Sequence, residues 1–190
     1  ALVVRKEKGR LRNYFHIGTG NYNSNTSRFY TDIGLLSTDP DISSDLIELF
    51  NYLSGFSKQK TYQKLLVSPT SLRKKFIFLI NREIENAKRG EKGEIIAKMN
   101  SLVDPEIIQL LYLASQKGVK IHLIIRGICC LYPQRKNLSE NIKVTSIIGN
   151  FLEHSRIFWF YNNNNSEVFI GSADWMRRNL DRRIAVSYTH

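Results

Sequence analysis

A strand, a capped helix and a second strand follow one another in the middle of the chain, and this order constrains the fold most strongly. Residues 94–98 and 119–125 are short runs rich in Ile, Leu and Val, which is typical of strands in a buried sheet. Asp104 followed by Pro105 indicates a helix start, and Gly118 indicates a helix end. Strands joined by a helix lie parallel in one sheet, so the sequence predicts an α/β fold.

Further elements are expected on both sides of this unit. Apolar alternation and turn residues predict the strands, and apolar residues at helical spacing predict the helices. The expected strands are residues 1–4, 14–18, 33–37, 65–69, 142–148, 156–161 and 167–171; the first two form a hairpin around Gly9, and the last two flank the asparagines at 162–165. The expected helices start at Asp39 and at Thr70 or Ser71, and they end at Gly55 and Gly90.

The chain carries 28 Lys and Arg against 17 Asp and Glu, a net charge of +11. A positive charge of this size attracts polyanions such as nucleic acid, phosphate chains, nucleotides or acidic lipid surfaces. It does not indicate which of them is the partner. With 42% hydrophobic residues the chain is not expected to be disordered, and no apolar run is long enough for a transmembrane segment. Cys129 and Cys130 are adjacent, which supports neither a disulfide framework nor a zinc site and fits the cytoplasm.

His154 and Arg156 form the most suggestive local pattern. In a strand, residues two apart share a face, so an imidazole and a fixed cation would stand side by side. This pairing suits phosphoryl chemistry, because imidazole attacks phosphorus and guanidinium holds phosphate oxygens. The strings Gly171–Asp174 and Gly18–Asn21 both end a strand and resemble each other, which suggests two half-sites built alike.

Longer strings carry a resemblance to a known family. They are, in order, His16–Asn23, Tyr30–Asp32, Leu49–Asn51, Lys98–Asp104, Leu123–Cys129, Phe151–Arg156, Gly171–Met176 and Arg178–Asp181. Together they resemble the polyphosphate kinase family, the phosphohistidine-forming type with a phospholipase-D-like catalytic region. The resemblance runs from Ala1 to about Ile184.

The resemblance implies a phospholipase-D-like mixed sheet flanked by helices, made of the end of one half-site and a complete second half. Residues 1–38 would end the first catalytic half, and residues 39–190 would form the second. The chain begins without Met, and its first four residues already form an apolar, strand-like run. We therefore expect it to be a fragment of a longer protein.

The resemblance further implies reversible transfer of the terminal phosphate of ATP to polyphosphate, with Mg²⁺, through a phosphohistidine upstream of Ala1. His154 would be the catalytic acid/base partner, and Tyr30, Arg126 and His154 would contact the nucleotide. The residues implied to bind or orient phosphate are Asn21, Arg156, Ser172, Asp174 and Arg178. The implied partners are ATP or ADP and polyphosphate, and DNA is not expected as a partner. No residue of the chain is expected to bind a metal ion. The full-length protein is expected to be a homo-oligomer.

Some positions depart from the family pattern. Asn150, Tyr132 and Gln134 stand where the family usually has Arg, Arg and Gly, so two charges near the polyanion path are missing, and Ala185 replaces a Glu. With the upstream histidine absent, we expect the fragment alone to be inactive. Two alternatives remain: a phospholipase-D-like phosphodiesterase, and a non-catalytic basic module that binds polyphosphate or nucleic acid electrostatically.

Overall fold

The computed structural model describes residues 1–56 and 61–189. The strands of this part are β1 (Leu2–Glu7), β2 (Arg10–Gly18), β3 (Tyr30–Thr31), β4 (Gly34–Ser37), β5 (Leu65–Val67), β6 (Glu94–Met99), β7 (Lys120–Ile125), β8 (Ile142–Thr145), β9 (Leu152–Glu153), β10 (Arg156–Phe160), β11 (Glu167–Gly171) and β12 (Val186–Thr189). The helices are η1 (Ser27–Phe29), α1 (Pro40–Leu53), α2 (Leu72–Lys88), α3 (Pro105–Gln116) and η2 (Arg178–Arg182).

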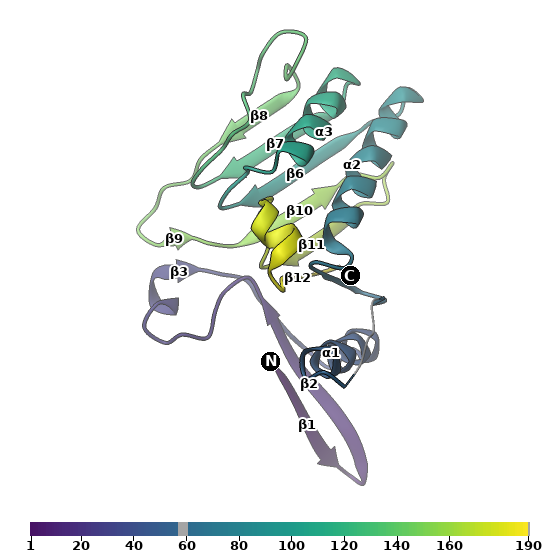
Figure 1. Cartoon of the computed structure of the whole chain (residues 1–190), viewed down its shortest axis with the longest axis vertical. Helices are drawn as coiled ribbons and strands as arrows, with labels where there is room; N and C mark the ends of the chain where they lie inside the picture. The colour runs from purple at the N-terminus through teal and green to yellow at the C-terminus, as the bar shows by residue number, and fades with distance from the viewer. Residues whose placement is uncertain (57–60, 190) are drawn as a thin grey trace.

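The main sheet has seven strands in the order β5-β12-β11-β10-β6-β7-β8 (Figure 1). Strands β6, β7 and β8 run parallel, whereas β10, β11, β12 and β5 pair antiparallel. The predicted α/β class with a mixed sheet is therefore confirmed. Because β10 is antiparallel to β6, its first residues lie at the edge where the parallel strands end.

Helices α2 and α3 lie side by side on one face of this sheet (Figure 1). Their apolar faces, with Phe76, Leu79 and Leu111 fully buried, form one continuous core with the sheet strands. Asp104 caps α3, since its carboxylate accepts from the Ile107 N–H at 3.1 Å. This large core gives the strand ends of the main sheet a rigid base.

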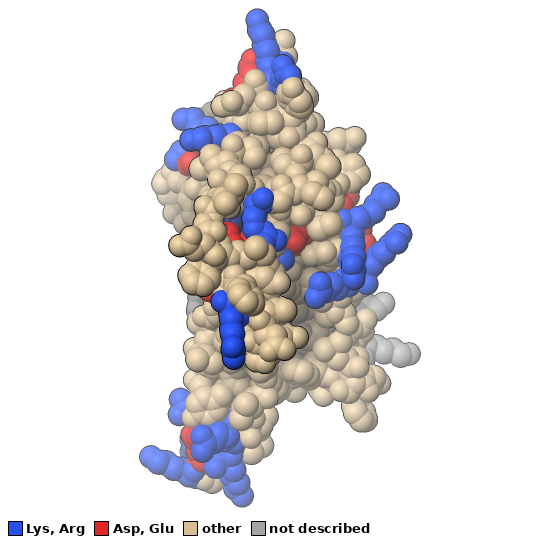
Figure 2. Space-filling view, turned by 90° about the vertical axis from the view of Figure 1, so that its left-hand side faces the viewer, with Lys and Arg blue, Asp and Glu red and all other residues tan. Residues whose placement is uncertain are grey.

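The N-terminal hairpin β1–β2 pairs with β4 in a separate three-stranded sheet and extends away from the main sheet (Figure 1). A second core joins this sheet to the rest of the chain: Phe15 of β2 and Leu46 of α1 pack with Leu65 and Tyr188 from the edge of the main sheet. The hairpin tip carries exposed cations, and Figure 2 shows them gathered at the bottom of that view. They are Arg5, Lys6, Lys8, Arg10 and Arg12.

The structure corrects the sequence analysis in a few places. The strand expected over 142–148 ends at Thr145, and the residues after it are largely exposed. Ser71 holds the N-cap position of α2 but makes no side-chain capping bond; its hydroxyl accepts instead from the Val67 N–H at 3.1 Å. Strands β3, β9 and β12 were not expected; β3 and β9 have only two residues each, too few for a periodicity to be recognised.

Among the described helices, none combines the length and the apolar character needed to cross a membrane.

Candidate active site

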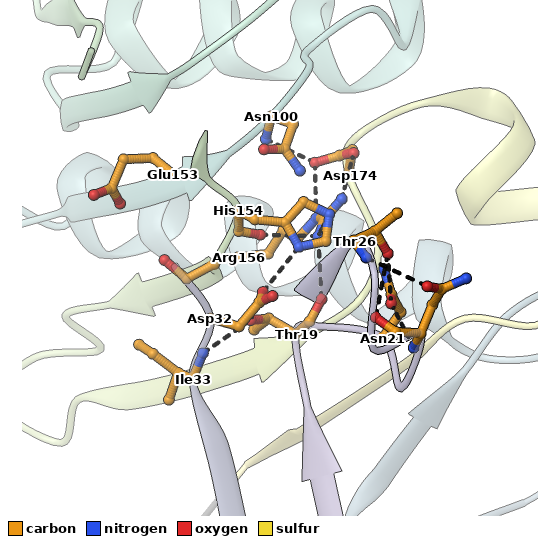
Figure 3. A network of polar contacts seen from close by, with 12 residues as sticks. Thr19, Asn21, Thr26, Asp32, Ile33, Asn100, Glu153, His154, Arg156 and Asp174 are labelled. Atoms are coloured by element: carbon orange, nitrogen blue, oxygen red, sulfur yellow. Dashed lines mark hydrogen bonds and ion pairs between the residues drawn. The ribbon is translucent and has the colours of Figure 1, made fainter. Parts of the chain in front are cut away.

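Arg156, the first residue of β10, lies at the centre of a polar network that joins distant parts of the chain (Figure 3). Its Nε and Nη2 atoms donate to the two carboxylate oxygens of Asp174, at 3.2 and 3.3 Å. Its Nη1 atom donates to the Thr19 carbonyl oxygen at 3.2 Å. The side chains of Arg156 and Asp174 are both 9% exposed, so this bidentate pair is shielded from water and firmly placed. The similar strings after β2 and β11 thus meet through one guanidinium.

His154 lies between β9 and β10, with both ring nitrogens engaged. Its Nδ1 atom is 2.8 Å from Oδ1 of Asp32, and its Nε2 atom is 3.0 Å from Nη1 of Arg156 (Figure 3). Guanidinium can only donate, so Nε2 accepts and the ring proton of neutral His154 sits on Nδ1. The imidazole and the guanidinium therefore lie side by side, as the sequence analysis predicted, although His154 itself precedes the strand.

Tyr30 stacks on the His154 ring, with centroids 4.7 Å apart and an interplanar angle of 19°. The parallel pairing of β3 with β9 brings them together, and the His154 N–H donates to the Thr31 carbonyl at 3.1 Å. One face of the imidazole is thereby covered by an aromatic ring. The predicted nucleotide-binding residues Tyr30 and His154 are brought into direct contact.

Asp32 is a site residue that the sequence analysis missed. Its carboxylate also accepts from the Thr19 hydroxyl at 2.7 Å, and the Ile33 N–H donates to the same hydroxyl at 3.1 Å. Gly20 allows this approach, since a Cβ atom there would lie 2.5 Å from Oδ2 of Asp32. The available signal was the spacing of Tyr30 and Asp32, which puts both on one side of an extended segment.

Other predicted residues are engaged outside the His154 contacts. The Asn21 side-chain oxygen accepts from the Asn23 N–H at 2.9 Å and the Thr26 hydroxyl at 3.2 Å, within its own loop (Figure 3). The Ser172 hydroxyl accepts from the Val186 N–H at 3.3 Å. Asp174 acts on His154 through Arg156. The geometry thus separates groups at the imidazole from groups that shape the surrounding loops.

Arg126 follows β7 at the carboxyl edge of the parallel strands. Its backbone N–H donates to the Met99 carbonyl at 3.3 Å, which fixes it beside the end of β6. Within residues 1–56 and 61–189, its side chain has no hydrogen bond or ion pair. A half-buried guanidinium without a carboxylate partner at this edge is a suitable anion ligand.

Lys98 adds a further cation one strand away. Its ammonium lies 2.7 Å from a carboxylate oxygen of Glu153 and also donates to the Ser155 hydroxyl. The residues on either side of His154 are therefore anchored to β6. This anchoring restricts how far the imidazole can move.

Three arginines around η2 form a separate basic hollow of about 460 Å³. Arg177, Arg178 and Arg182 line it, and all three are exposed. The predicted phosphate-binding residue Arg178 thus lies in this hollow. Its charge adds to a basic surface on which a polyanion could lie.

Arg73 of α2 holds the segment that carries these arginines. Its guanidinium lies 2.6 Å from carboxylate oxygens of Asp104, Glu106 and Asp181. The hydrogen bonds to Asp104 and Asp181 raise the pKa of Arg73 further above its usual range. Burial disfavours the charged form of Asp104, but the hydrogen bonds from Arg73 and from the Ile107 N–H outweigh it and hold the pKa of Asp104 below its usual value.

The described residues contain no group of three or more His, Cys, Asp or Glu placed to hold a metal ion. The carboxylates nearest His154 are already paired: Asp32 with the imidazole, Asp174 with Arg156, and Glu153 with Lys98. These residues therefore do not fit a protein-held Mg²⁺ site.

The fold and the network define an α/β domain in which a histidine, oriented by a carboxylate and an arginine, faces a basic edge. A family model for polyphosphate kinase C-terminal domain 1 matches residues 1–59, and one for C-terminal domain 2 matches residues 65–189. The chain therefore belongs to the polyphosphate kinase family, whose C-terminal part it represents. The resemblance drawn from the sequence strings is confirmed.

Individual relatives agree. The chain is 70% identical over 183 residues to a polyphosphate kinase of Prochlorococcus marinus, covering 96% of this chain and 26% of that protein. It is 57% identical to one from Synechocystis, covering 96% and 25%. The crystal structure of polyphosphate kinase from Porphyromonas gingivalis superposes with a TM-score of 0.91 at 43% identity, covering 100% of this chain and 29% of that one. The chain thus spans about a quarter of the length of the curated relatives it matches.

Proposed function

We propose that this chain supplies the second catalytic half of an ATP:polyphosphate phosphotransferase, which moves the terminal phosphate of ATP to polyphosphate reversibly. The observation that carries the proposal is the orientation of His154 between Asp32 and Arg156. An imidazole fixed on both nitrogens beside a buried cation is suited to proton transfer at a phosphoryl group.

In this proposal His154 is the acid/base group. Its Nε2 atom accepts a hydrogen bond from Nη1 of Arg156. When a phosphate group binds, one of its oxygens would accept this hydrogen bond in place of Nε2. Nε2 would then be free to take or give a proton, while Asp32 keeps the ring in place. The histidine that carries the phosphoryl group lies upstream of Ala1 by the family resemblance, so we propose that this chain alone binds substrates without transferring phosphate.

The remaining residues would neutralise and orient the phosphates. Phosphoryl transfer depends mainly on positioning and on charge compensation. Arg126 and Arg156 would hold phosphate oxygens, and Arg178 would extend the basic surface for the polymer.

Tyr30 would lie against both the imidazole and the nucleotide. Asn21 and Ser172 would act by shaping their loops, and Asp174 by holding Arg156.

The substrates of the proposed reaction are Mg²⁺-bound ATP or ADP and polyphosphate, with Mg²⁺ arriving on the nucleotide. DNA is not a proposed partner. The family resemblance also motivates two proposals for the full-length protein: it is a homo-oligomer, and it works in the cytoplasm.

We propose a boundary between the two catalytic halves at residues 38 and 39. It falls where β4 has ended at Ser37 and before α1 begins at Pro40. The two family models meet later, between residues 59 and 65, and α1 packs against β2 in the second core. Helix α1 therefore belongs to the second catalytic half in our division, whereas it falls within the family model of C-terminal domain 1.

A segment exchange tests the proposed function. This chain replaces the matching segment of the Prochlorococcus marinus relative, and incorporation of labelled phosphate from ATP into polyphosphate is measured. We expect the chimera to be active and His154→Ala in it to abolish transfer. An inactive chimera that folds and binds ATP would overturn the proposal for this segment.

The basic hollow at η2 favours one alternative, a module that binds polyanions without catalysis. This alternative predicts binding that weakens steeply with salt and is indifferent to His154→Ala. Loss of transfer in the histidine variant, with polyphosphate binding retained, would exclude it.

A further inference from the structure

The side chain of Asn100 presents an unusual chemical situation. Asn100 follows β6 and is 5% exposed, yet neither its Oδ1 nor its Nδ2 atom has a hydrogen-bond partner in the described part of the chain. Buried polar groups are almost always paired, because an unpaired one costs stability. An unpaired amide beside a candidate active site is therefore a candidate for hydrogen bonding to a ligand.

The backbone of Asn100 fixes where this amide lies. Its N–H donates to Oδ1 of Asp174 at 2.8 Å, and Asp174 in turn holds Arg156. On the other side, the carbonyl of Asn100 accepts from the Gly127 N–H at 2.8 Å, directly after Arg126. Figure 3 shows Asn100 beside Asp174.

Along the sheet edge, Asn100 thus lies between the residues Arg126 and Arg156. The register of β6 and β7 pairs Met99 with Ile125, so the next residues, Asn100 and Arg126, are neighbours at the carboxyl edge. Arg156 begins β10 on the opposite side of β6. An anion held by both arginines would therefore lie close to Asn100.

We propose that Asn100 is a phosphate-binding residue whose Nδ2 atom donates a hydrogen bond to an oxygen of a phosphate group held between Arg126 and Arg156. This inference rests on the proposed function and adds a residue to its site. The arginines supply charge, and the neutral amide supplies a directional donor without repelling the anion. The amide is buried, so entry of the phosphate requires a local rearrangement of side chains around it.

The decisive variant is Asn100→Leu, which keeps the approximate volume and removes both polar atoms. Affinity for tripolyphosphate is measured on this chain by titration calorimetry, and the thermal midpoint is measured in the same buffer. We expect affinity to fall about tenfold or more, the loss of one hydrogen bond to a charged group. We expect the midpoint to stay or rise, because an unpaired buried amide has been removed. Asn100→Asp should weaken binding further by repulsion.

Ser43→Ala is the matched control. Ser43 lies in α1, and its hydroxyl is likewise buried without a partner among the described residues. Its removal should leave the midpoint unchanged or raised, as in Asn100→Leu, without changing tripolyphosphate affinity.

The outcomes separate the inference from the proposed function. If Arg126→Gln weakens binding and Asn100→Leu does not, the inference is wrong and the proposed site stands. If Asn100→Leu lowers affinity and midpoint together, the amide has a structural role and the inference is overturned. If the unmodified chain, shown to be folded, does not bind tripolyphosphate, the proposed function fails as well.

Discussion

The Nδ1 atom of His154 lies 2.8 Å from Oδ1 of Asp32, although 122 residues separate them in sequence. On the opposite side of the ring, Arg156 can only donate to Nε2. The contacts therefore define a single tautomer of neutral His154, with its proton on Nδ1 and its lone pair on Nε2. This arrangement holds Nδ1 against a carboxylate and leaves the lone pair on Nε2, the atom that we propose as the acid/base group.

Replacing Asp32 with Asn tests this tautomer. We expect ¹⁵N NMR of the unmodified chain to show His154 in the Nδ1–H form when neutral. In Asp32→Asn, the side chain can donate to Nδ1 as well as accept from it, and only the Arg156 contact still favours the Nδ1–H form, so a fraction of the Nε2–H tautomer should appear. In the chimera described above, phosphate transfer should fall by about 100-fold, the lower range for a mispositioned acid/base group.

Thr19→Val is the control for that change. It removes the hydroxyl that donates to Asp32 but keeps the carboxylate. The Nδ1–H tautomer should persist in this variant. An Nε2–H tautomer in the unmodified chain would contradict the assignment.

Gly20→Ala should disturb the same contact without changing any charge. Its new Cβ atom would lie 2.5 Å from Oδ2 and 2.7 Å from Cγ of Asp32, so the carboxylate must shift away from His154. We expect mixed tautomers of His154 by NMR, as in Asp32→Asn. Gly149→Ala is the control, because its nearest atom would be 3.9 Å away. Unchanged His154 spectra in Gly20→Ala would show that the loop relaxes instead.

Arg156→Gln should destabilise the fold as well as the site. It leaves the 6%-exposed Asp174 without its bidentate partner, which costs about 3 kcal/mol when a buried pair is broken. Urea unfolding measures the change. Arg156→Gln and Asp174→Asn combined should cost less than the sum of the single changes, by about 1 kcal/mol or more. Strict additivity would show that the two side chains are not coupled in solution.

Asp104→Asn should give a pH-dependent loss of stability. The pKa of Asp104 lies below its ordinary value of 3.8, so its charged form stabilises the fold above that pH, and this contribution disappears as pH falls. Asn still caps α3 but loses the charge paired with Arg73. Urea unfolding at pH 7 should show a loss of about 1.5–3 kcal/mol that shrinks at pH 3.

Asp41→Asn serves as the comparison, since this exposed first-turn carboxylate of α1 faces no such arginine contact in the described structure. Its effect should stay below about 1 kcal/mol. An Asp104→Asn deficit that is equal at both pH values would argue against the ion pair as its source.

The sequence predicted the parts of the fold that rest on local rules. Asp104 with Pro105 marked the start of α3, and the apolar run ending at Ile125 marked β7. The asparagine turn was also predictable, since Asn162 adopts a positive φ of 46°. These features depend on neighbours in the chain, which is why a single sequence reveals them.

The missed features depend on distant partners. Strand β3 forms because Tyr30 pairs with Leu152. A strand of two residues has no sequence pattern from which it could be predicted. Asp32 is a site residue only because β3 delivers it to His154. His154 and Arg156 were recognisable as a pair two residues apart, whereas the orphan amide of Asn100 becomes visible only when every buried polar atom has been matched with a partner.

Arg156 donates to the carbonyl of Thr19, 137 residues earlier in the chain, and to the carboxylate of Asp174, which follows it. The network therefore closes one of the longest loops in the molecule, and such contacts form late because their entropic cost must be met first. During synthesis, a ribosome-bound chain that has not yet emerged beyond Asp174 has not assembled the site that we propose to bind phosphate. Binding of phosphate at the proposed site would thus require a completely folded chain, and a truncated polypeptide that ends before Asp174 would lack it.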